Sequence, residues 1–540
     1  MTPELFLREF GELAENPGGV QRLRDLVLDL AIRGQLEEAS KRVLRAGALT
    51  EIPKKWQVEA LGDFAQIIRG ITFPASAKTR EPSPGHVACL RTTNVQRTIE
   101  WHDLLYVPEK FVSRPEQWVR PGDLCISMAN SYELVGKVAQ VTETPPKVTF
   151  GGFLGIIRPD ERAFPAYLTL FMRSSTVQTE LRKGATQTTN IANISLGKLR
   201  PLPVSIPSLD EQKRIIAKVD QLLALCDELE AKQKKKRETA VRVNKASLSA
   251  VVSAPSGSAL KDAWKRVADH FEVLYDLPEN VKELRQTILQ LAVMGKLVKQ
   301  DPADEPAGSL LERSVAEIRK HQGKRYQDLQ PAESDIVPFQ VPSGWSWARI
   351  GELTWRVEYG TSQKAHTESH GIPILRMGNI VGGALDYGNL KYVPKSTEGI
   401  DDLILAPGDL IFNRTNSYEQ VGKMAVFWER ERSFTFASYL IRLSLTPDIL
   451  PDYVSAYFET PVCRKTQIEP EITVQTNQAN FNGTKLKSVL VPLPPSSEQQ
   501  RIMVEIKRFT ELCDSLGAKI SSSGDNCERL MQAVVERLVA

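Results

Sequence analysis

The sequence contains an internal duplication, and this repeat restricts the possible folds more than any other feature of the chain. Three segments of the first half match three segments of the second half in the same order, with identity at 8 of 17, 12 of 19 and 12 of 27 positions. The matching pairs are 20–36 with 281–297, 121–139 with 407–425, and 189–215 with 476–502. The 540 residues are therefore expected to form two copies of a unit of about 270 residues rather than three unrelated domains.

The spacing between the copies changes at two places, which indicates where the halves differ. Between the first match and the pair Trp56/Trp345 the offset grows from 261 to 289, so the second half carries about 28 extra residues within 298–335. This stretch is polar and has prolines near its ends, which favours a linker or a helical extension. Between residues 62 and 90 the offset falls to 285, which predicts a shorter loop in the second copy.

A long helix is predicted at the end of each half. Ser208 and Glu211 have the spacing of a capping box, and Ser496 and Gln499 repeat it. Apolar residues then recur at alternating steps of four and three, which is typical of a narrow seam covered by a partner helix. The seam residues are Ile215, Val219, Leu222, Cys226 and Leu229, and Ile502, Ile506, Phe509, Cys513, Leu516 and Ile520. A continuous helix over 210–244 would be about 50 Å long.

Each half also opens with an amphipathic segment, residues 20–34 and 281–295, which ends in Gly34 and Gly295. Glycine just after the last apolar residue is typical of a helix C-terminus. The symmetry of the repeat suggests that the first helix of each half packs against the last helix of the other half. The monomer would then be a pseudo-twofold object.

The segments between the helices have the pattern of strands, because short apolar runs alternate with turns rich in Gly, Pro and Asn. Trp56 and Trp345 occupy equivalent places and are expected to be core anchors. The predicted fold class is α+β, with two similar domains separated by long paired helices that act as coiled-coil spacers. The expected division is N-terminal helices that pair with the distal helix (1–48), the first domain (49–207), a central helical spacer (208–300), a linker or helical extension (301–335), the second domain (336–494) and a distal helical region (495–540).

Composition excludes several classes of protein. The hydrophobic fraction is 41% and the charged fraction 25%, as in ordinary folded proteins, and 69 Lys and Arg against 66 Asp and Glu give no bulk indication of nucleic-acid binding. Six cysteines without CxxC spacing predict reduced thiols rather than a disulfide scaffold. The N-terminal sequence lacks the pattern of a secretion signal and no apolar run could span a bilayer, so a cytoplasmic location without a membrane partner is expected.

Familiar catalytic motifs are missing from the sequence. It has no GxxxxGK[ST] loop, no GxGxxG after a predicted strand, and no Asn/Asp-Pro-Pro-aromatic tetrad of amino-methyltransferases. FGGFLG at 150–155 looks like a glycine loop, but its counterpart FASYLI at 436–441 favours a strand. His366 and His370 lie four residues apart, yet in a predicted loop without a counterpart in the first half, so no metal site is expected. No catalytic residues are expected either.

The order helix, domain, helix, domain, helix resembles the specificity subunit of type I restriction-modification systems. The resemblance covers nearly the whole chain and rests on residues 288–307, which open the second half, and 491–502, which close the second domain. It implies a non-catalytic protein whose two target-recognition domains each read one half of a split, asymmetric DNA site, with paired helices setting the gap. It also implies three partners: double-stranded DNA, two adenine-methyltransferase subunits and two restriction and translocation subunits. S-adenosylmethionine, ATP and Mg²⁺ would be bound by those subunits and not by this chain.

Two other classes of function remain open. The chain could be a coiled-coil scaffold that assembles proteins without touching DNA, or a complete methyltransferase with its own specificity. The missing Pro-Pro-aromatic motif argues against the methyltransferase. Two similar domains on one chain are a monomeric counterpart of the twofold dimers that read two half-sites, which favours DNA recognition over the scaffold.

The repeat also separates two kinds of candidate DNA-binding residue. Residues identical in both domains cannot by themselves explain different half-sites, so they would be scaffold, phosphate contacts or contacts to a shared feature such as the adenine to be methylated. This shared set is Asn130, Ser131, Tyr132 and Lys137 with Asn416, Ser417, Tyr418 and Lys423. Its Asn and Tyr residues can equally be turn formers and core caps, while its lysines suit phosphates. Turn chemistry is favoured for Asn190, Asn193, Asn477 and Asn480.

Residues that differ at equivalent places would read the distinct bases. The candidate loops contain Arg91, Thr92, Thr93 and Asn94 against Arg376, Met377, Gly378 and Asn379, residues 127–129 against Asn413, Arg414 and Thr415, and Thr72 and Lys78 against Thr361 and Lys364. Arg414, opposite Met128, is the leading base reader because a guanidinium can hold guanine with two hydrogen bonds. The basic run at 232–237 has no counterpart at 519–524 and is either a solvated helix face or a phosphate contact.

Overall fold

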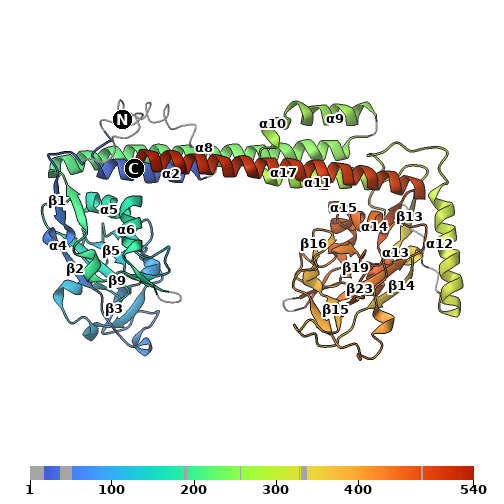
Figure 1. Ribbon diagram of the computed structural model, residues 1–540, viewed down its shortest axis with the longest axis horizontal. Coiled ribbons are helices and arrows are strands. Elements are labelled where there is room, and N and C mark those ends of the chain that lie inside the picture. Colours follow the sequence, from blue (N-terminus) through green and yellow to red (C-terminus); the bar gives the residue numbers. More distant parts are fainter. Residues whose placement is uncertain are drawn as a thin grey trace. The chain divides into compact units, whose positions relative to one another are not determined.

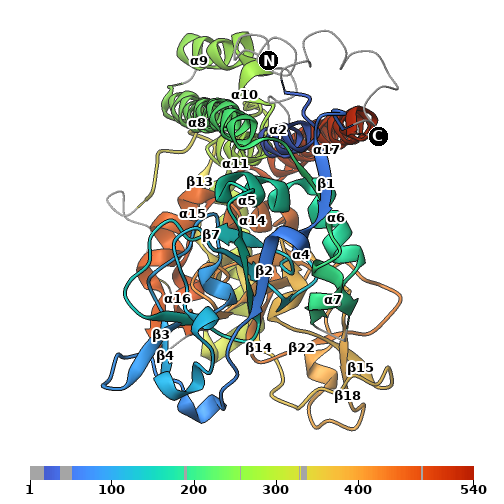
Figure 2. The same ribbon diagram turned by 90° about the vertical axis from the view of Figure 1, so that its left-hand side faces the viewer.

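The computed structural model describes residues 18–36, 52–187, 191–255, 257–326, 329, 337–475 and 478–539, without the side chains of Arg325, Gln475 and 523–539. It forms two compact units, Met1–Lys236 with Ser522–Ala540, and Arg237–Ser521. Each unit contains one globular domain that lies against helices. In both views the sheets of β3 (His86–Leu90) and β15 (Ile372–Leu375) lie at the end of their domain away from those helices (Figures 1 and 2).

The first domain is built from four small sheets. The antiparallel sheet β2-β9-β5-β7 is the largest, and it is accompanied by β4-β3-β8, β10-β11-β6 and β1-β12, with β3 and β8 parallel. The strands are β1 (Gln57–Ala60), β2 (Ala65–Arg69), β3 (His86–Leu90), β4 (Leu105–Pro108), β5 (Leu124–Ser127), β6 (Ala129–Asn130), β7 (Val138–Gln140), β8 (Val148–Phe150), β9 (Leu154–Pro159), β10 (Thr186–Gln187), β11 (Ala192–Asn193) and β12 (Pro203–Ile206).

The second domain repeats these pairings strand for strand, as β14-β23-β19-β21, β18-β15-β22, β20-β25-β24 and β13-β26, again with one parallel pair, β15 and β22. It adds the hairpin of β16 and β17. The strands are β13 (Ser346–Arg349), β14 (Thr354–Tyr359), β15 (Ile372–Leu375), β16 (Ile380–Val381), β17 (Ala384–Leu385), β18 (Lys391–Val393), β19 (Leu410–Asn413), β20 (Thr415–Asn416), β21 (Met424–Val426), β22 (Thr435–Phe436), β23 (Leu440–Leu445), β24 (Thr473–Gln475), β25 (Gln478–Asn480) and β26 (Leu490–Leu493). The predicted duplication and the α+β class are confirmed.

Two loop predictions have different outcomes. The connection from β14 to β15 is shorter than that from β2 to β3, as the offset predicted. The strand expected at 150–155 is wrong for its middle, because β8 ends at Phe150, β9 begins at Leu154, and Gly151–Phe153 form a turn between them.

Two long helices, α8 (Leu209–Ser253) and α17 (Ser496–Val539), end the two halves. The predicted seam of α8 is confirmed, because Val219, Leu222 and Cys226 are buried in the core of the first unit. The prediction of a capping box at the start of each long helix is wrong. Glu211 and Gln499 use their side chains on the globular domains instead, since those contacts satisfy buried donors of Trp56 and of the backbone at Leu450.

The shorter helices lie on the domains or on the long helices. They are α2 (Gly19–Ile32), α4 (Leu61–Phe64), α5 (Pro165–Arg173), α6 (Ser175–Lys183), α7 (Leu196–Leu199), α9 (Ser258–Asp269), α10 (Phe271–Leu274), α11 (Pro278–Val293), α12 (Ala307–Gln322), α13 (Ile350–Leu353), α14 (Pro451–Phe458), α15 (Pro461–Cys463) and α16 (Gly483–Ser488). Gly34 and Gly295 follow α2 and α11 with φ of 69° and 68°, which is the expected glycine stop. Among the residues whose structure is given, no helix is long and apolar enough to cross a membrane.

The first helix of each half packs against the long helix of its own half. In the first unit Arg24 of α2 bonds Asp227 and Glu230 of α8 at 2.6 Å each. In the second unit, Arg285 of α11 pairs with Asp514 of α17. These contacts within one half were not predicted, because the symmetry of the repeat suggested only packing against the last helix of the other half.

Helix α11 also contacts the end of α8, its expected partner. Lys296, just after α11, donates to the carbonyl oxygens of Val252 and Ala254 at 2.7 and 2.8 Å. The pairing of α2 with the distal part of α17 stays a prediction, because it falls on side chains beyond the described ones.

A buried Trp–Glu contact joins each domain to its long helix. Trp56 Nε1 donates to Glu211 Oε1 at 3.1 Å, and Trp345 Nε1 donates to Glu498 Oε2 at 2.9 Å. Both tryptophans are buried, as expected of core anchors. Because the indole N–H is a donor that burial would otherwise leave unsatisfied, each contact holds the domain in one orientation on its helix.

The next residue of each long helix adds a second contact of the same kind. Gln212 Oε1 accepts from the backbone N–H of Phe164 at 2.7 Å, and Gln499 Oε1 accepts from that of Leu450 at 2.8 Å. Both glutamines are fully buried. We call the Trp–Glu and Gln contacts together the domain–helix joint, and it is the same in both halves.

Residues 301–335, expected to be a linker or a helical extension, contain α12. Its Leu310 is buried in the core of the second domain, and Ser314 Oγ donates to the carbonyl oxygen of Glu352 at 2.7 Å. The described part of this stretch therefore includes a helix, Ala307–Gln322, that packs on the second domain.

Candidate DNA-recognition surface

The turn between β8 and β9 brings three candidate loops of the first domain together. Ile71 N donates to Phe150 O at 2.9 Å, Gly151 N donates to Leu90 O at 2.9 Å, and Met128 N donates to Phe153 O at 2.9 Å. The segments after β2, β3 and β5 thus end around one turn of three residues, Gly151–Phe153. We call this turn, with residues 69–72 and 128–132, the recognition edge of the first domain.

The second domain builds the same arrangement around Ala437–Tyr439. Thr361 N donates to Phe436 O at 2.9 Å, Ala437 N donates to Leu375 O at 2.9 Å, and Arg414 N donates to Tyr439 O at 3.1 Å. Its recognition edge consists of this turn with residues 359–362 and 414–418. The backbone of the edge is therefore duplicated, and the two domains differ in the side chains that it carries.

A glycine makes this close approach possible in each copy. A Cβ atom on Gly70 would lie 2.2 Å from the carbonyl oxygen of Gly151, and one on Gly360 would lie 2.1 Å from that of Phe436. No side chain fits at such distances, so the strand end can reach the turn only through glycine.

The shared residues of the first domain divide into structural and exposed ones. Asn130 Oδ1 accepts from the backbone N–H of Ser131 at 2.9 Å, which is turn chemistry, while Tyr132 is exposed. Lys137 Nζ is half-buried and donates to Gln96, so it is not the free phosphate contact that the sequence suggested.

The second domain treats the same residues alike. Asn416 Oδ1 accepts from Ser417 N at 2.8 Å, and Tyr418 is exposed. Thr415 is buried and donates to Asn480 Oδ1 at 2.7 Å, which makes it a structural residue. Asn193 is exposed at the register position of Ala129. Asn190 and Asn477 lie outside the described residues.

Lys423 is half-buried and has an acidic neighbour. Burial raises the pKa of Glu459, and the nearby Lys423 ammonium opposes that rise. At the place of Glu459, 286 residues earlier, the first domain has Arg173, whose pKa is lowered by burial and by Arg97. The residue at this place is therefore acidic in the second domain and basic in the first.

The asparagines after β3 and β15 hold loops rather than face outward. Asn94 is buried, accepts from Arg91 N at 3.1 Å and donates to the carbonyl oxygens of Glu100 and His102 at 3.1 Å each. Asn379 is buried too and accepts from Arg376 N at 2.9 Å.

The arginines of these loops have a structural partner as well. Arg91 donates to the carbonyl oxygen of Asp103 at 2.8 Å, and Arg376 donates to that of Asn389 at 2.7 Å. In the first domain, Thr92 and Thr93 lie between Arg91 and Asn94. They are the polar side chains of this loop that have no structural partner named above, and Thr93 is exposed.

The leading base-reading candidate lies on the recognition edge. Arg414 is half-buried; its guanidinium lies 4.9 Å from the ring centre of Tyr359, Nη1 donates to Ser438 O at 3.2 Å, and Nε is buried without a partner among the described residues. Stacking on an aromatic face leaves the edge of a guanidinium free to form hydrogen bonds.

The first domain supplies its arginine from a different strand. Met128, the counterpart of Arg414, is buried against Gly155, and the residue paired with Gly155 at the end of β2 is the exposed Arg69. In the second domain the matching strand end is Tyr359. Each edge thus presents one arginine, from β2 in one copy and from the segment after β19 in the other.

Sequence reasoning missed Arg69, Tyr359 and the tips of the two turns. Phe153 is 66% exposed and Tyr439 45% exposed at equivalent places. Their signal was an aromatic residue in both copies of a glycine- or serine-containing turn, which had been assigned to a strand. Thr72, Lys78 and Lys364 are exposed in the adjoining loops, and Thr361 is half-buried.

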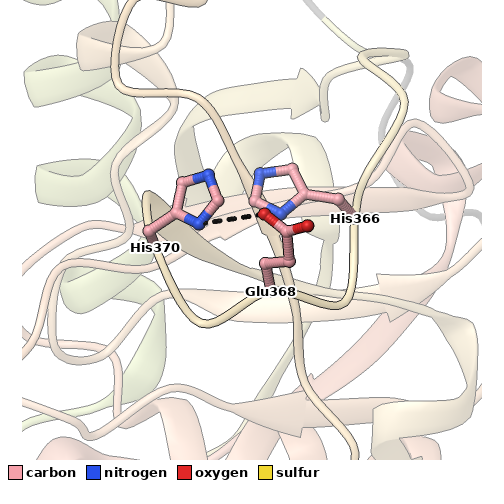
Figure 3. A group of neighbouring side chains, drawn as sticks. All are labelled: His366, Glu368 and His370. Atoms are coloured by element: carbon pink, nitrogen blue, oxygen red, sulfur yellow. Dashed lines mark ion pairs between the residues drawn. The ribbon is translucent and has the colours of Figure 1, made fainter.

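One group of side chains could hold a metal ion among the residues that the structure covers. The ligand atoms of His366, Glu368 and His370, in the loop between β14 and β15, all lie within 4.8 Å of one another (Figure 3). Glu368 completes a three-ligand set that the spacing of the histidines alone did not reveal, while the expectation that no metal binds there stays a prediction.

Comparison with known proteins agrees with the repeat. A family model described as "Type I restriction modification DNA specificity domain" matches residues 53–238 and again 342–522. The EcoAI specificity subunit of Escherichia coli is 25% identical over 96% of this chain and 94% of its own length, and the EcoKI subunit of strain K12 is 24% identical over 90% and 89%. A solved HsdS subunit from Thermoanaerobacter tengcongensis aligns over 91% of this chain and 97% of its own at 16% identity, with a TM-score of 0.38. Since the family model covers more than half of the residues, this chain belongs to the type I restriction-modification specificity-subunit family.

Proposed function

We propose that each domain reads one half of a split, asymmetric DNA site through its recognition edge. The observation that carries the proposal is the duplicated edge with different side chains: Arg69 and Phe153 on one copy, Arg414 and Tyr439 on the other. A common backbone would place both edges alike on DNA, and the differing side chains would read different bases.

The domain–helix joint supports readout at a fixed spacing. Buried hydrogen bonds from Trp56 and Trp345 to their helices restrict the motion of each domain on its own helix. Helix α8 is continuous over 45 residues, roughly 68 Å at 1.5 Å per residue. The gap between half-sites would follow from the length of the long helices.

We propose further that the chain acts as a subunit without catalysis of its own, in the cytoplasm. Methyltransferase and restriction subunits would bring the chemistry together with S-adenosylmethionine, ATP and Mg²⁺. The exposed apolar side chains Val504 and Leu512 on α17, which are 66% and 57% exposed, would contact a methyltransferase subunit.

The proposal is tested by exchanging one domain. The chain is produced with methyltransferase subunits, and the methylated adenines of genomic DNA are mapped. Replacing residues 49–207 with the matching domain of another specificity subunit is expected to change one half of the methylated motif, and replacing 336–494 the other half. A change in both halves by either exchange would show that readout is not independent.

The scaffold alternative predicts a different result. A protein that only assembles partners would give no sequence-dependent methylation, and neither exchange would alter a motif. Membership of the DNA-specificity family favours the DNA-reading role over the scaffold.

A further inference from the structure

The loop between β14 and β15 gathers three metal-ligating side chains in five residues. His370 Nδ1 lies 3.4 Å from Glu368 Oε2, and the rings of His366 and His370 are stacked with centres 4.7 Å apart (Figure 3). Two imidazoles and one carboxylate are ligands that zinc commonly uses, and they leave a fourth position for water.

Both ends of this loop are fixed to one strand. His366 and Tyr392 of β18 exchange two backbone hydrogen bonds of 2.9 Å each. At the other end Gly371 has a φ of 110°, and a Cβ atom there would lie 2.2 Å from the carbonyl oxygen of Val393. Because Tyr392 and Val393 are neighbours, the loop starts and ends at nearly one point, and its side chains converge.

Side-chain rotation can bring the ligand atoms of His366, Glu368 and His370 to the separations that a bound ion requires. Four ligands at 2.0–2.1 Å from a tetrahedral ion lie roughly 3.3 Å apart. The ligand atoms here are within 4.8 Å, and Glu368 and His370 are exposed and free to rotate about their χ angles. His366 Nδ1 is buried without a hydrogen-bond partner among the described residues, which leaves that ring nitrogen without a role in the protein alone.

We propose that His366, Glu368 and His370 bind one divalent transition-metal ion of the zinc class. The site would cross-link the loop beside Thr361, whose backbone pairs with the turn of the second recognition edge. The first domain has Thr79 at the position of His366, paired in the same way with Tyr106. The metal would therefore stiffen one domain and not the other.

Among the side chains that the structure describes, other possible ligands are poor competitors for the ion. His102 Nε2 lies 3.5 Å from Glu100 Oε2. This pair supplies one imidazole and one carboxylate but lacks the second imidazole of the proposed site. The described cysteines are buried, and burial raises the pKa of the Cys89 thiol to about 12, so its thiolate is scarce.

The site is tested by titrating the full chain with Zn²⁺ against a colour-forming chelator. Wild type is expected to take up one equivalent, His370→Gln to bind at least about tenfold more weakly, and His366→Gln/His370→Gln to lose the site. His102→Gln is the matched control and is expected to bind like wild type. Hydrogen exchange of residues 366–371 should slow on adding Zn²⁺ only in wild type and the control.

Two results would overturn the site. One is equal uptake by wild type and the double variant, and the other is an equal loss in His102→Gln, which would mark the binding as unspecific. Because His370 is exposed, His370→Gln tests the site even if the double variant does not fold. Neither measurement requires DNA, so the metal site and the proposed readout can fail separately.

Discussion

Arg414 offers the sharpest test of base reading on the second edge. We predict that Arg414→Met removes discrimination at one base pair of the second half-site and leaves the other half unchanged. Methionine is unbranched and flexible like the stem of arginine, but it has no hydrogen-bond donor for a base. The variant loses one hydrogen bond to Ser438, worth about 1 kcal/mol of stability.

The expected size is that of a contact between a guanidinium and guanine. A bidentate contact to guanine contributes ~1–3 kcal/mol of discrimination, which corresponds to roughly 5- to 150-fold in binding. The assay is binding of the subunit complex to DNA in which each base pair of the half-site is substituted in turn. Wild type should show a penalty of this size at one position, and Arg414→Met should bind all four base pairs there alike.

A phosphate contact would behave differently. Loss of a phosphate-binding arginine weakens binding to every sequence and lowers the slope of log affinity against log salt by about one. That result, with the base preference intact, would refute base reading by Arg414. Arg430→Met, at an exposed arginine of the same domain, is the matched control and should change neither quantity.

Further outcomes test the rest of the reasoning. Arg69→Met should abolish discrimination at one base pair of the first half-site only, measured with the same substituted DNAs. Phe153→Ala should weaken DNA binding without changing the melting temperature, because the ring is 66% exposed and packs little. Inserting seven residues into both α8 and α17 keeps the seam in register and should lengthen the gap in the methylated motif by about three base pairs, since seven residues add roughly 10.5 Å. The joints should respond oppositely to pH. Burial raises the pKa of Glu498, so its contribution to folding is present below the unfolded value of 4.5 and is lost as the pH rises through the raised pKa. Burial also acts to raise the pKa of Glu211, but hydrogen bonds from Lys55 and Trp56 lower it overall, so its contribution is present above 4.5 and is lost as the pH falls through the lowered pKa. Thermal unfolding from pH 3 to 7 should therefore show Glu498→Gln gaining on wild type as the pH rises and Glu211→Gln losing; parallel behaviour would contradict these assignments.

The repeat made the fold predictable, because two copies of one pattern reveal which positions matter. The seam of α8 and the anchors Trp56 and Trp345 follow from periodicity and position, and the structure buries them. The turn at Gly151–Phe153 did not follow, because an apolar run with glycines reads as a strand until its hydrogen bonds to three other loops are seen.

The site was harder to predict than the fold for a physical reason. Asn94 and Asn379 are polar loop residues that look exposed in a sequence, yet they are buried and satisfy backbone groups. Arg69 and Tyr359 were overlooked because each becomes a partner of the recognition edge only through strand pairing across the sheet. Such long-range pairing leaves no local signal.

The exchange of the arginine between strands explains how a duplicated domain can acquire a new specificity without a new fold. The segments of each edge are joined to its turn by backbone hydrogen bonds, so exposed side chains such as Arg69 and Phe153 can change without breaking these bonds. In the first copy the small Gly155 lets Met128 pack inward while Arg69 stays exposed, and in the second copy Tyr359 forms a platform for Arg414. An arginine that starts from another strand meets DNA at another position and angle. Two similar domains can therefore read different half-sites, which is what an asymmetric target requires.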